Sequence, residues 1–241
     1  MIIIITIMVF LLVPRYSRIK PGLKYVDLSL SKDILVLGGK FLLIQISMLV
    51  IYQAINFIIM RNLGAESVTL YNVLYKYYGA VNTIFIVFLT PFWSASTDAY
   101  VNGDITWIRN GIKKMRLFFI LLIVVQIILV IISPWLLKLW LNVTIEVPWS
   151  TNIMMAIYLL IVSYTALYLY FINGIGKITM QMIVYISYAC VSLPLMIIGS
   201  KIFGLNAIIF VITILNVILI IIGKIQIEKI LSRSAKGLWN K

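Results

Sequence analysis

Long apolar runs of about twenty residues, separated by short polar connections, dominate the chain. Helices of that length cross the hydrocarbon core of a bilayer, whereas transmembrane strands would need short segments of alternating polarity. The pattern predicts six membrane-spanning helices, at residues 36–60, 71–93, 117–137, 153–172, 183–200 and 205–223. The expected fold class is therefore all-α, a polytopic membrane protein.

The N-terminal apolar stretch differs from these six spans. Residues 2–13 are apolar but too short to cross a bilayer, and they end in Pro14-Arg15 rather than in the small residues of a signal-peptide cleavage site. We interpret them as the end of a transmembrane helix whose beginning is missing. The expected division is a partial transmembrane helix (1–14), a basic cytoplasmic loop (15–35), a six-helix transmembrane lobe (36–223) and a basic cytoplasmic tail (224–241).

The span at 71–93 has one apolar and one polar side at 100° per residue. The polar side comprises Asn72, Lys76, Gly79, Thr83, Thr90 and Ser94, with Tyr71, Tyr75, Tyr78 and Asn82 next to it. Such a helix shows one face to lipid and the other to partner helices or to a water-filled cavity. We take Asn72, Tyr75, Lys76, Asn82 and Thr83 as candidate cavity residues.

Lys76 is the sharpest of these candidates because it lies about one turn inside the expected outer interface. In low-dielectric surroundings its ammonium would attract a pyrophosphate or an acidic sugar. The alternative is that Lys76 extends outward to the interface among the neighbouring tyrosines.

In the first full span, Gln53 and Asn56 share a third of the helix circumference with Gln45, Tyr52 and Met60. Gln53 and Asn56 are candidates for hydrogen bonds to sugar hydroxyls along a cavity wall. Interhelical hydrogen bonding is an equally weighted interpretation.

Charged residues near the span ends are candidates for gates or loop contacts. Asp98 and Asp104 would latch a cytoplasmic gate against Arg109 or Lys113, although solvated helix caps are the commoner role of such residues. Arg61 lies in the short outer connection, where it would guard the outer mouth or simply flank a turn at Gly64. Asp104 or Thr106 is also expected to open a short amphipathic helix at the interface.

The charge distribution changes the meaning of the net charge of +13. Fifteen of the twenty basic residues fall before the first span, in the connections after the second and fourth spans, and in the C-terminal tail. The connections after the first, third and fifth spans hold only Arg61, Lys138 and Lys201. This asymmetry places the C-terminus in the cytoplasm. The positive charge is then an orientation signal and a contact with anionic membrane lipids, not a nucleic-acid footprint.

Composition narrows the chemistry further. The chain is 63% hydrophobic with a mean hydropathy of +1.11, it contains no histidine, and its single cysteine, Cys190, lies in an apolar run. No aspartate or glutamate lies in the central part of any predicted span, which excludes a carboxylate proton relay or two-carboxylate glycosyl chemistry at mid-membrane in this lobe. The composition thus lacks the usual catalytic and metal-binding groups, and we expect no metal site and no cofactor.

The segment from Gly39 to Lys114 carries a resemblance. Tyr71-Asn72-Val73, Tyr75-Lys76-Tyr77, the run TPFWSASTDAY (90–100), Asp104 and Trp107-Ile108 resemble the Wzx-type polysaccharide flippases of the multidrug/oligosaccharidyl-lipid/polysaccharide exporter superfamily. The rest of the chain is similar only in helix number and spacing.

The resemblance implies that this chain is the C-terminal lobe of a two-lobe flippase in the bacterial cytoplasmic membrane. Such proteins move undecaprenyl-pyrophosphate-linked oligosaccharides across the membrane in polysaccharide or O-antigen (lipopolysaccharide) biosynthesis, by alternating access of a central cavity. It also implies that Lys76 faces this cavity. Because the family has about twice this many spans, a partner N-terminal lobe, from the same gene or a separate chain, is expected.

Two other classes stay open. One is a non-transporting membrane subunit or truncated remnant, whose polar side chains only join helices. The other is a membrane glycosyltransferase or O-antigen polymerase, which would favour long outer loops with arginine or carboxylate clusters; neither feature occurs in the sequence.

Overall fold

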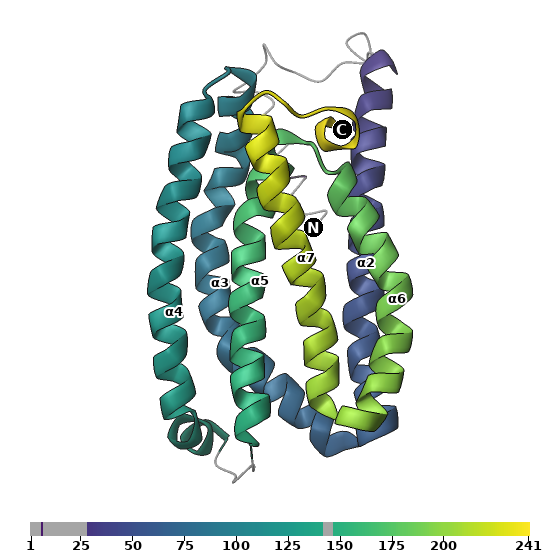
Figure 1. Cartoon of the computed structure of the whole chain (residues 1–241), viewed down its shortest axis with the longest axis vertical. Coiled ribbons are helices and arrows are strands. Elements are labelled where there is room, and N and C mark those ends of the chain that lie inside the picture. Colours follow the sequence, from purple (N-terminus) through teal and green to yellow (C-terminus); the bar gives the residue numbers. More distant parts are fainter. Residues whose placement is uncertain (1–5, 7–27, 142–146) are drawn as a thin grey trace. The chain divides into compact units, whose positions relative to one another are not determined.

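The computed structural model describes Thr6, residues 28–141 and residues 147–241. Its long helices are α2 (Leu28–Leu63), α3 (Ala65–Val101), α4 (Ile105–Leu141), α5 (Trp149–Ile175), α6 (Thr179–Phe203) and α7 (Leu205–Leu231), followed by a short 3-10 turn, η3 (Gly237–Asn240) (Figure 1). All six long helices are sufficiently long and apolar to cross a membrane. The predicted all-α, multi-pass membrane fold is confirmed.

Each helix extends beyond the apolar run that predicted it. α3 and α4 each contain 37 residues, a length of about 55 Å, whereas the hydrocarbon core is about 30 Å thick. The separate interfacial helix expected near Asp104 is wrong, because α4 runs without a break from Ile105 into the third span. Backbone hydrogen bonding continues past the hydrocarbon boundary wherever no residue interrupts it.

Of the basic loop expected at 15–35, residues 28–35 belong to α2, which begins at Leu28, and residues 15–27 lie outside the described residues. The partial N-terminal helix expected at 1–14 lies outside the described residues apart from Thr6. At the other end of the chain, the expected tail at 224–241 begins as the last turns of α7 and continues into η3.

Two of the helix connections consist of one glycine each. Gly64 alone separates α2 from α3 with φ +86°, and Gly204 alone separates α6 from α7 with φ +63°. Both values lie where residues with a Cβ atom are strained, so glycine allows the chain to reverse in one residue. Both turns lie at the same end of the lobe (Figure 1), which we call the Gly64 end; the opposite end, where Gly176 terminates α5, we call the Gly176 end.

Residues 40–241 form one compact unit, and residues 1–39 form a second unit that is considered separately. In the larger unit α5 is the central helix: it packs against α3, α4 and α7, and α6 packs against α7. Of the most apolar stretch of α5, 61% is buried, compared with 17% for α2 and α4. α5 is therefore a core helix, whereas α2 and α4 present most of their apolar surface outward.

Close helix contacts at glycine bring α5 against its neighbours. A Cβ atom added at Gly174 would collide with the backbone carbonyl of Trp93 in α3, and one at Gly223 of α7 would lie 3.0 Å from Cβ of Tyr168 in α5. Beside the first contact, the Thr97 hydroxyl donates a hydrogen bond to the Gly174 carbonyl at 2.7 Å. The small residue permits the backbones to approach, and the hydrogen bond fixes the crossing.

Buried polar side chains of α5 bond to different neighbouring helices. Asn152 accepts a hydrogen bond from the Tyr78 hydroxyl of α3 at 2.5 Å and donates one to Ser133 of α4 at 2.8 Å. The hydroxyl of Thr165 donates to the backbone carbonyl of Asn216 in α7 at 3.1 Å. Since an unpaired polar group in this environment is costly, these bonds fix how α3, α4 and α7 align along α5.

Candidate functional site

The outward face of α3 carries a line of polar side chains that runs along most of the helix. We call it the α3 polar stripe; it consists of Thr69, Asn72, Lys76, Thr83, Thr90, Ser94 and Thr97. All of these are exposed except Asn72, which is half-buried, and Ala80 and Val87 interrupt the line. Elsewhere the large exposed side chains of the spans are overwhelmingly aliphatic or aromatic. The stripe is thus a polar path among spans whose exposed side chains are mostly apolar.

The threonines of the stripe are satisfied within their own helix. The hydroxyls of Thr69, Thr83 and Thr90 donate to the carbonyls of the residues four positions earlier, at 3.1, 3.0 and 2.8 Å. This back-bonding reduces the cost of placing a hydroxyl against lipid. The threonines alone therefore do not require water, and the argument for a wet surface depends on the stripe's charged member.

Lys76 is that member. Its side chain is exposed and has no hydrogen-bond or ion-pair partner within the described part of the chain. A hydrocarbon core about 30 Å thick centred on α3 would enclose Lys76 about one turn inside its boundary. At that depth an ammonium either faces a cavity or partner, or extends to the interface.

Asn56 of α2 and Asn72 of α3 are brought together. The Asn72 amide donates to the Asn56 side-chain oxygen and to the Val68 carbonyl, both at 2.9 Å. Both amides are half-buried. This pair is an interhelical clamp in the structure, which is one of the two interpretations that the sequence left open.

The remaining candidate cavity residues divide between contact and exposure. Asn82 accepts a hydrogen bond from Ser163 of α5 at 2.9 Å and so joins helices. Gln53 is exposed on α2, and Tyr75 stacks on Tyr71 with ring centroids 6.0 Å apart while keeping 38% of its surface exposed. Gln53, Tyr75, Lys76 and Thr83 are therefore the candidates that a ligand can reach.

The predicted gate residues do not form a latch in this conformation. Asp98, Asp104 and Arg109 are exposed near the Gly176 end, and none of them makes an ion pair with any described residue. The Asp104 side chain instead accepts a hydrogen bond from the Trp107 amide at 2.9 Å and caps the first turn of α4. The gate stays a prediction, while capping by Asp104 is a finding.

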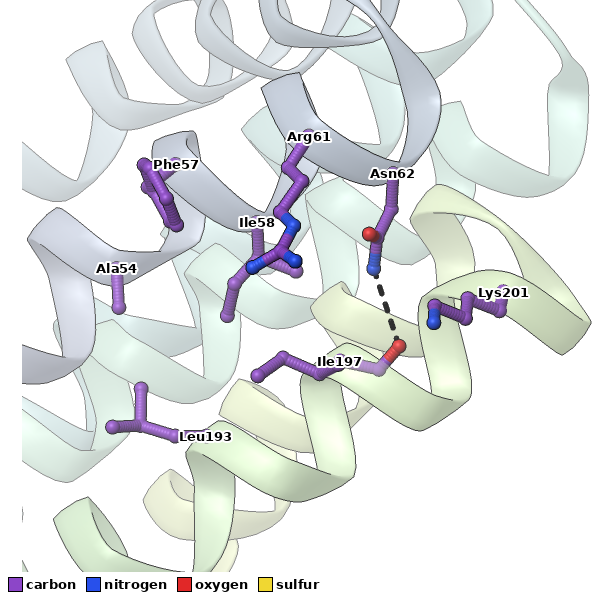
Figure 2. Close-up of a pocket in the computed structure, with 8 residues that line it drawn as sticks. All are labelled: Ala54, Phe57, Ile58, Arg61, Asn62, Leu193, Ile197 and Lys201. Atoms are coloured by element: carbon purple, nitrogen blue, oxygen red, sulfur yellow. Dashed lines mark hydrogen bonds between the residues drawn. The ribbon is translucent and has the colours of Figure 1, made fainter.

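Arg61 lies at the opposite end, where the structure places it in a groove between α2 and α6. The groove has a volume of about 240 Å³ and is lined by Ala54, Phe57, Ile58, Arg61, Asn62, Leu193, Ile197 and Lys201. Figure 2 shows Arg61 and Lys201 approaching it from facing helices. The sequence singled out Arg61 but not Lys201; the available signal was that both belong to the few basic residues outside the basic connections.

A second arginine contact was also missed. Arg116 of α4 donates to the Tyr168 hydroxyl at 3.0 Å, and the Tyr164 and Tyr168 hydroxyls lie 3.1 Å apart. The guanidinium carbon lies 5.6 Å from the centre of the Tyr168 ring. The spacing of two tyrosines four residues apart on one helix was the only sequence signal for this cluster.

Within residues 28–141 and 147–241 no group of three or more histidine, cysteine, aspartate or glutamate side chains is arranged to hold a metal ion. Comparison with protein-family models, with curated proteins and with solved structures finds no match for this chain. The functional argument therefore depends on the residues themselves.

Proposed function

We propose that this chain is one lobe, the C-terminal one, of a flippase that moves undecaprenyl-pyrophosphate-linked glycan units across the bacterial cytoplasmic membrane. The observation that carries the proposal is the α3 polar stripe with its exposed Lys76. Among spans whose exposed side chains are mostly apolar, a polar path with an unpaired cation is the surface expected to line a water-filled cavity.

The exposed groups suit a glycan on a charged lipid carrier. The Lys76 ammonium attracts the pyrophosphate, while Gln53 and Thr83 supply amide and hydroxyl groups for sugar hydroxyls, and Tyr75 supplies a ring face. The polyprenyl tail stays in the bilayer. Transport of this kind makes and breaks no covalent bond, so the chain acts as a transporter and not as an enzyme.

A second lobe completes the proposed cavity. Among the described helices, α2 and α4–α7 leave the stripe uncovered, which supports a second group of helices facing it, in the same polypeptide or in a separate one. Rocking of two such lobes would open the cavity to each side in turn. The excess of basic residues near the Gly176 end supports a cytoplasmic location of that end and of the C-terminus in this proposal.

A specific observation favours one competing function, a membrane subunit that does not transport. Asn56, Asn72 and Asn82 all form interhelical hydrogen bonds, and the stripe threonines bond to their own helix. If Lys76 extends to the interface, the polar groups only hold helices together.

A genetic test separates the two functions. In the native host, deletion of the gene is expected to leave lipid-linked glycan on the cytoplasmic side, measured as loss of glycan accessible to a membrane-impermeant lectin on spheroplasts. Wild type should restore the signal, and K76A should restore about one tenth or less, since a charge-assisted contact is worth roughly 1.5–3 kcal/mol.

The matched control is K138A, which removes another exposed lysine that lies in the last turn of α4 and not on α3. It should restore the signal fully. Equal rescue by K76A and wild type, at equal protein levels in the membrane, would contradict the proposed role of Lys76. An unchanged signal after gene deletion would contradict the flippase itself.

A further inference from the structure

The groove between α2 and α6 has features of a lipid site that is separate from the α3 stripe. Asn56, which bonds to α3, and Arg61, which lines the groove, are five residues apart on α2. At 100° per residue they point about 140° apart around the helix. The groove therefore lies on the side of α2 that points away from its Asn56–Asn72 contact with α3.

Its two cations lie at the ends of their helices. Arg61 is two residues before the end of α2, and Lys201 is two residues before the end of α6. Both are exposed, neither has a partner among the described residues, and none of the lining residues is acidic. Two uncompensated positive charges thus meet at the level expected for phospholipid headgroups.

From the cations toward the middle of the two helices, the groove is apolar. Its walls are the side chains of Ala54, Phe57, Ile58, Leu193 and Ile197. From Arg61 back to Ala54, and from Lys201 back to Leu193, each helix descends by about 10–12 Å. The upper part of an acyl chain has that length and polarity.

The α2–α6 contact is held at the top of the groove. The Asn62 amide donates to the Ser200 hydroxyl at 2.8 Å and to the Ile197 carbonyl at 3.2 Å, the latter drawn in Figure 2. Beneath these bonds the two helices leave the 240 Å³ groove between them. An apolar chain in the groove would replace the missing packing contacts.

We propose that this groove binds an anionic phospholipid of the outer leaflet. The phosphodiester lies between Arg61 and Lys201, and one acyl chain lies along the apolar wall. The bound lipid is a structural partner that fastens α2 to α6. This inference does not depend on the proposed transport function.

The test uses the purified full chain in a non-ionic detergent, with dioleoyl phosphatidylglycerol or dioleoyl phosphatidylcholine added. Native mass spectrometry measures lipid binding, and thermal unfolding measures stabilisation. Phosphatidylglycerol should bind more tightly and raise the unfolding temperature more. R61Q/K201Q should weaken phosphatidylglycerol binding by roughly tenfold or more, because each cation near an anionic headgroup contributes about 1 kcal/mol.

Three variants locate the site. K138Q removes a cation in the last turn of α4, a helix that ends at the Gly64 end (Figure 1), and Lys138 does not line the groove, so binding should be unchanged. R61K/K201R keeps both charges and should retain the preference. L193W fills the apolar wall without touching either cation, so it should reduce binding if the acyl chain enters the groove.

Three results would overturn the proposal. Equal binding of the two phospholipids would remove the role of the cations. Full binding by L193W would indicate diffuse surface attraction rather than a groove. Undecaprenyl phosphate that displaces phosphatidylglycerol at equimolar concentration would show that the site belongs to the polyprenyl carrier.

Discussion

At the scale of single residues, the tightest constraint lies where Gly174 meets α3. The Trp93 carbonyl and the Ser96 side chain occupy the space that a Cβ atom would need, and Thr97 bonds to the Gly174 carbonyl. The obstacle includes backbone, which cannot rotate away as a flexible side chain can. Any larger residue must therefore separate the two helices.

We expect G174A to destabilise the protein by about 1–3 kcal/mol, the usual cost of overpacking. The matched control is G79A in α3, where nothing lies within 4 Å of the added atom; alanine there should be neutral or slightly stabilising because of its higher helix propensity. Reversible unfolding in mixed micelles measures both variants. A G174A protein as stable as G79A would contradict the close crossing.

The same scale shows what the sequence conceals. Asn72 and Asn82 were recognisable as polar residues in an apolar span, but their partners were not. Whether an amide faces a ligand or a second helix depends on which helices are neighbours, and periodicity within one helix holds no information about that. The bonds from Asn72 to Asn56 and from Ser163 to Asn82 appear only in three dimensions.

At the scale of helices, α3 and α4 have equal lengths but different exposed faces. The exposed face of α4 is aliphatic through its span, with Val124, Ile128 and Ile131 among its members, whereas α3 repeats small polar residues. α4 is thus suited to lipid on that face. If the polar face of α3 lies against water, side chains on it will react differently than if that face lies against lipid.

Cysteine labelling shows whether water or lipid lies against the polar face of α3, in a background where exposed Cys190 is replaced by serine. T83C and T90C should react with a water-soluble methanethiosulfonate in native membranes, because thiolates form in water and not in hydrocarbon. V124C and I128C on α4 should stay unreactive. Equal lack of reaction on both helices would place the stripe against lipid or protein and contradict a water-filled cavity.

The existence and order of the six helices followed from hydropathy, because each crossing requires a long apolar run. Their ends did not, since a helix continues beyond the hydrocarbon until a residue such as Gly64 or Gly204 stops it. The central place of α5 was also hidden. Its run is less hydrophobic than that of α4, and its distinguishing feature, polar residues such as Asn152 and Thr165 pointing to different neighbours, acquires meaning only from packing.

At the scale of the whole molecule, the connections at the Gly64 end bear few cations and those near the Gly176 end bear many. Two of the few cations at the Gly64 end, Arg61 and Lys201, nevertheless line the same groove although they are far apart in sequence. No counting of charges per loop predicts such a meeting, because it depends on α2 and α6 lying side by side.

The charge asymmetry yields a prediction about orientation. In the C190S background, K138C should be labelled by a membrane-impermeant maleimide on intact cells, whereas S232C, just after α7, should be labelled only after permeabilisation. The two positions are both exposed, so accessibility within the protein does not favour either. The reverse pattern would place the C-terminus outside.

The single Asn62 attachment between α2 and α6 has a mechanical consequence. Both hydrogen bonds that the described residues form between α2 and α6 come from the Asn62 side chain, at the Gly64 end. From Asn62 back to Lys40, α2 is a lever about 33 Å long. A swing of about 10° around Asn62 would displace the Lys40 end by roughly 6 Å, and it would have to break the Asn56–Asn72 hydrogen bond and the stacking of Phe41 on Trp93. A rotation of that size hardly moves the Asn62 end of α2, whereas it moves the Lys40 end by more than the rise of one helical turn.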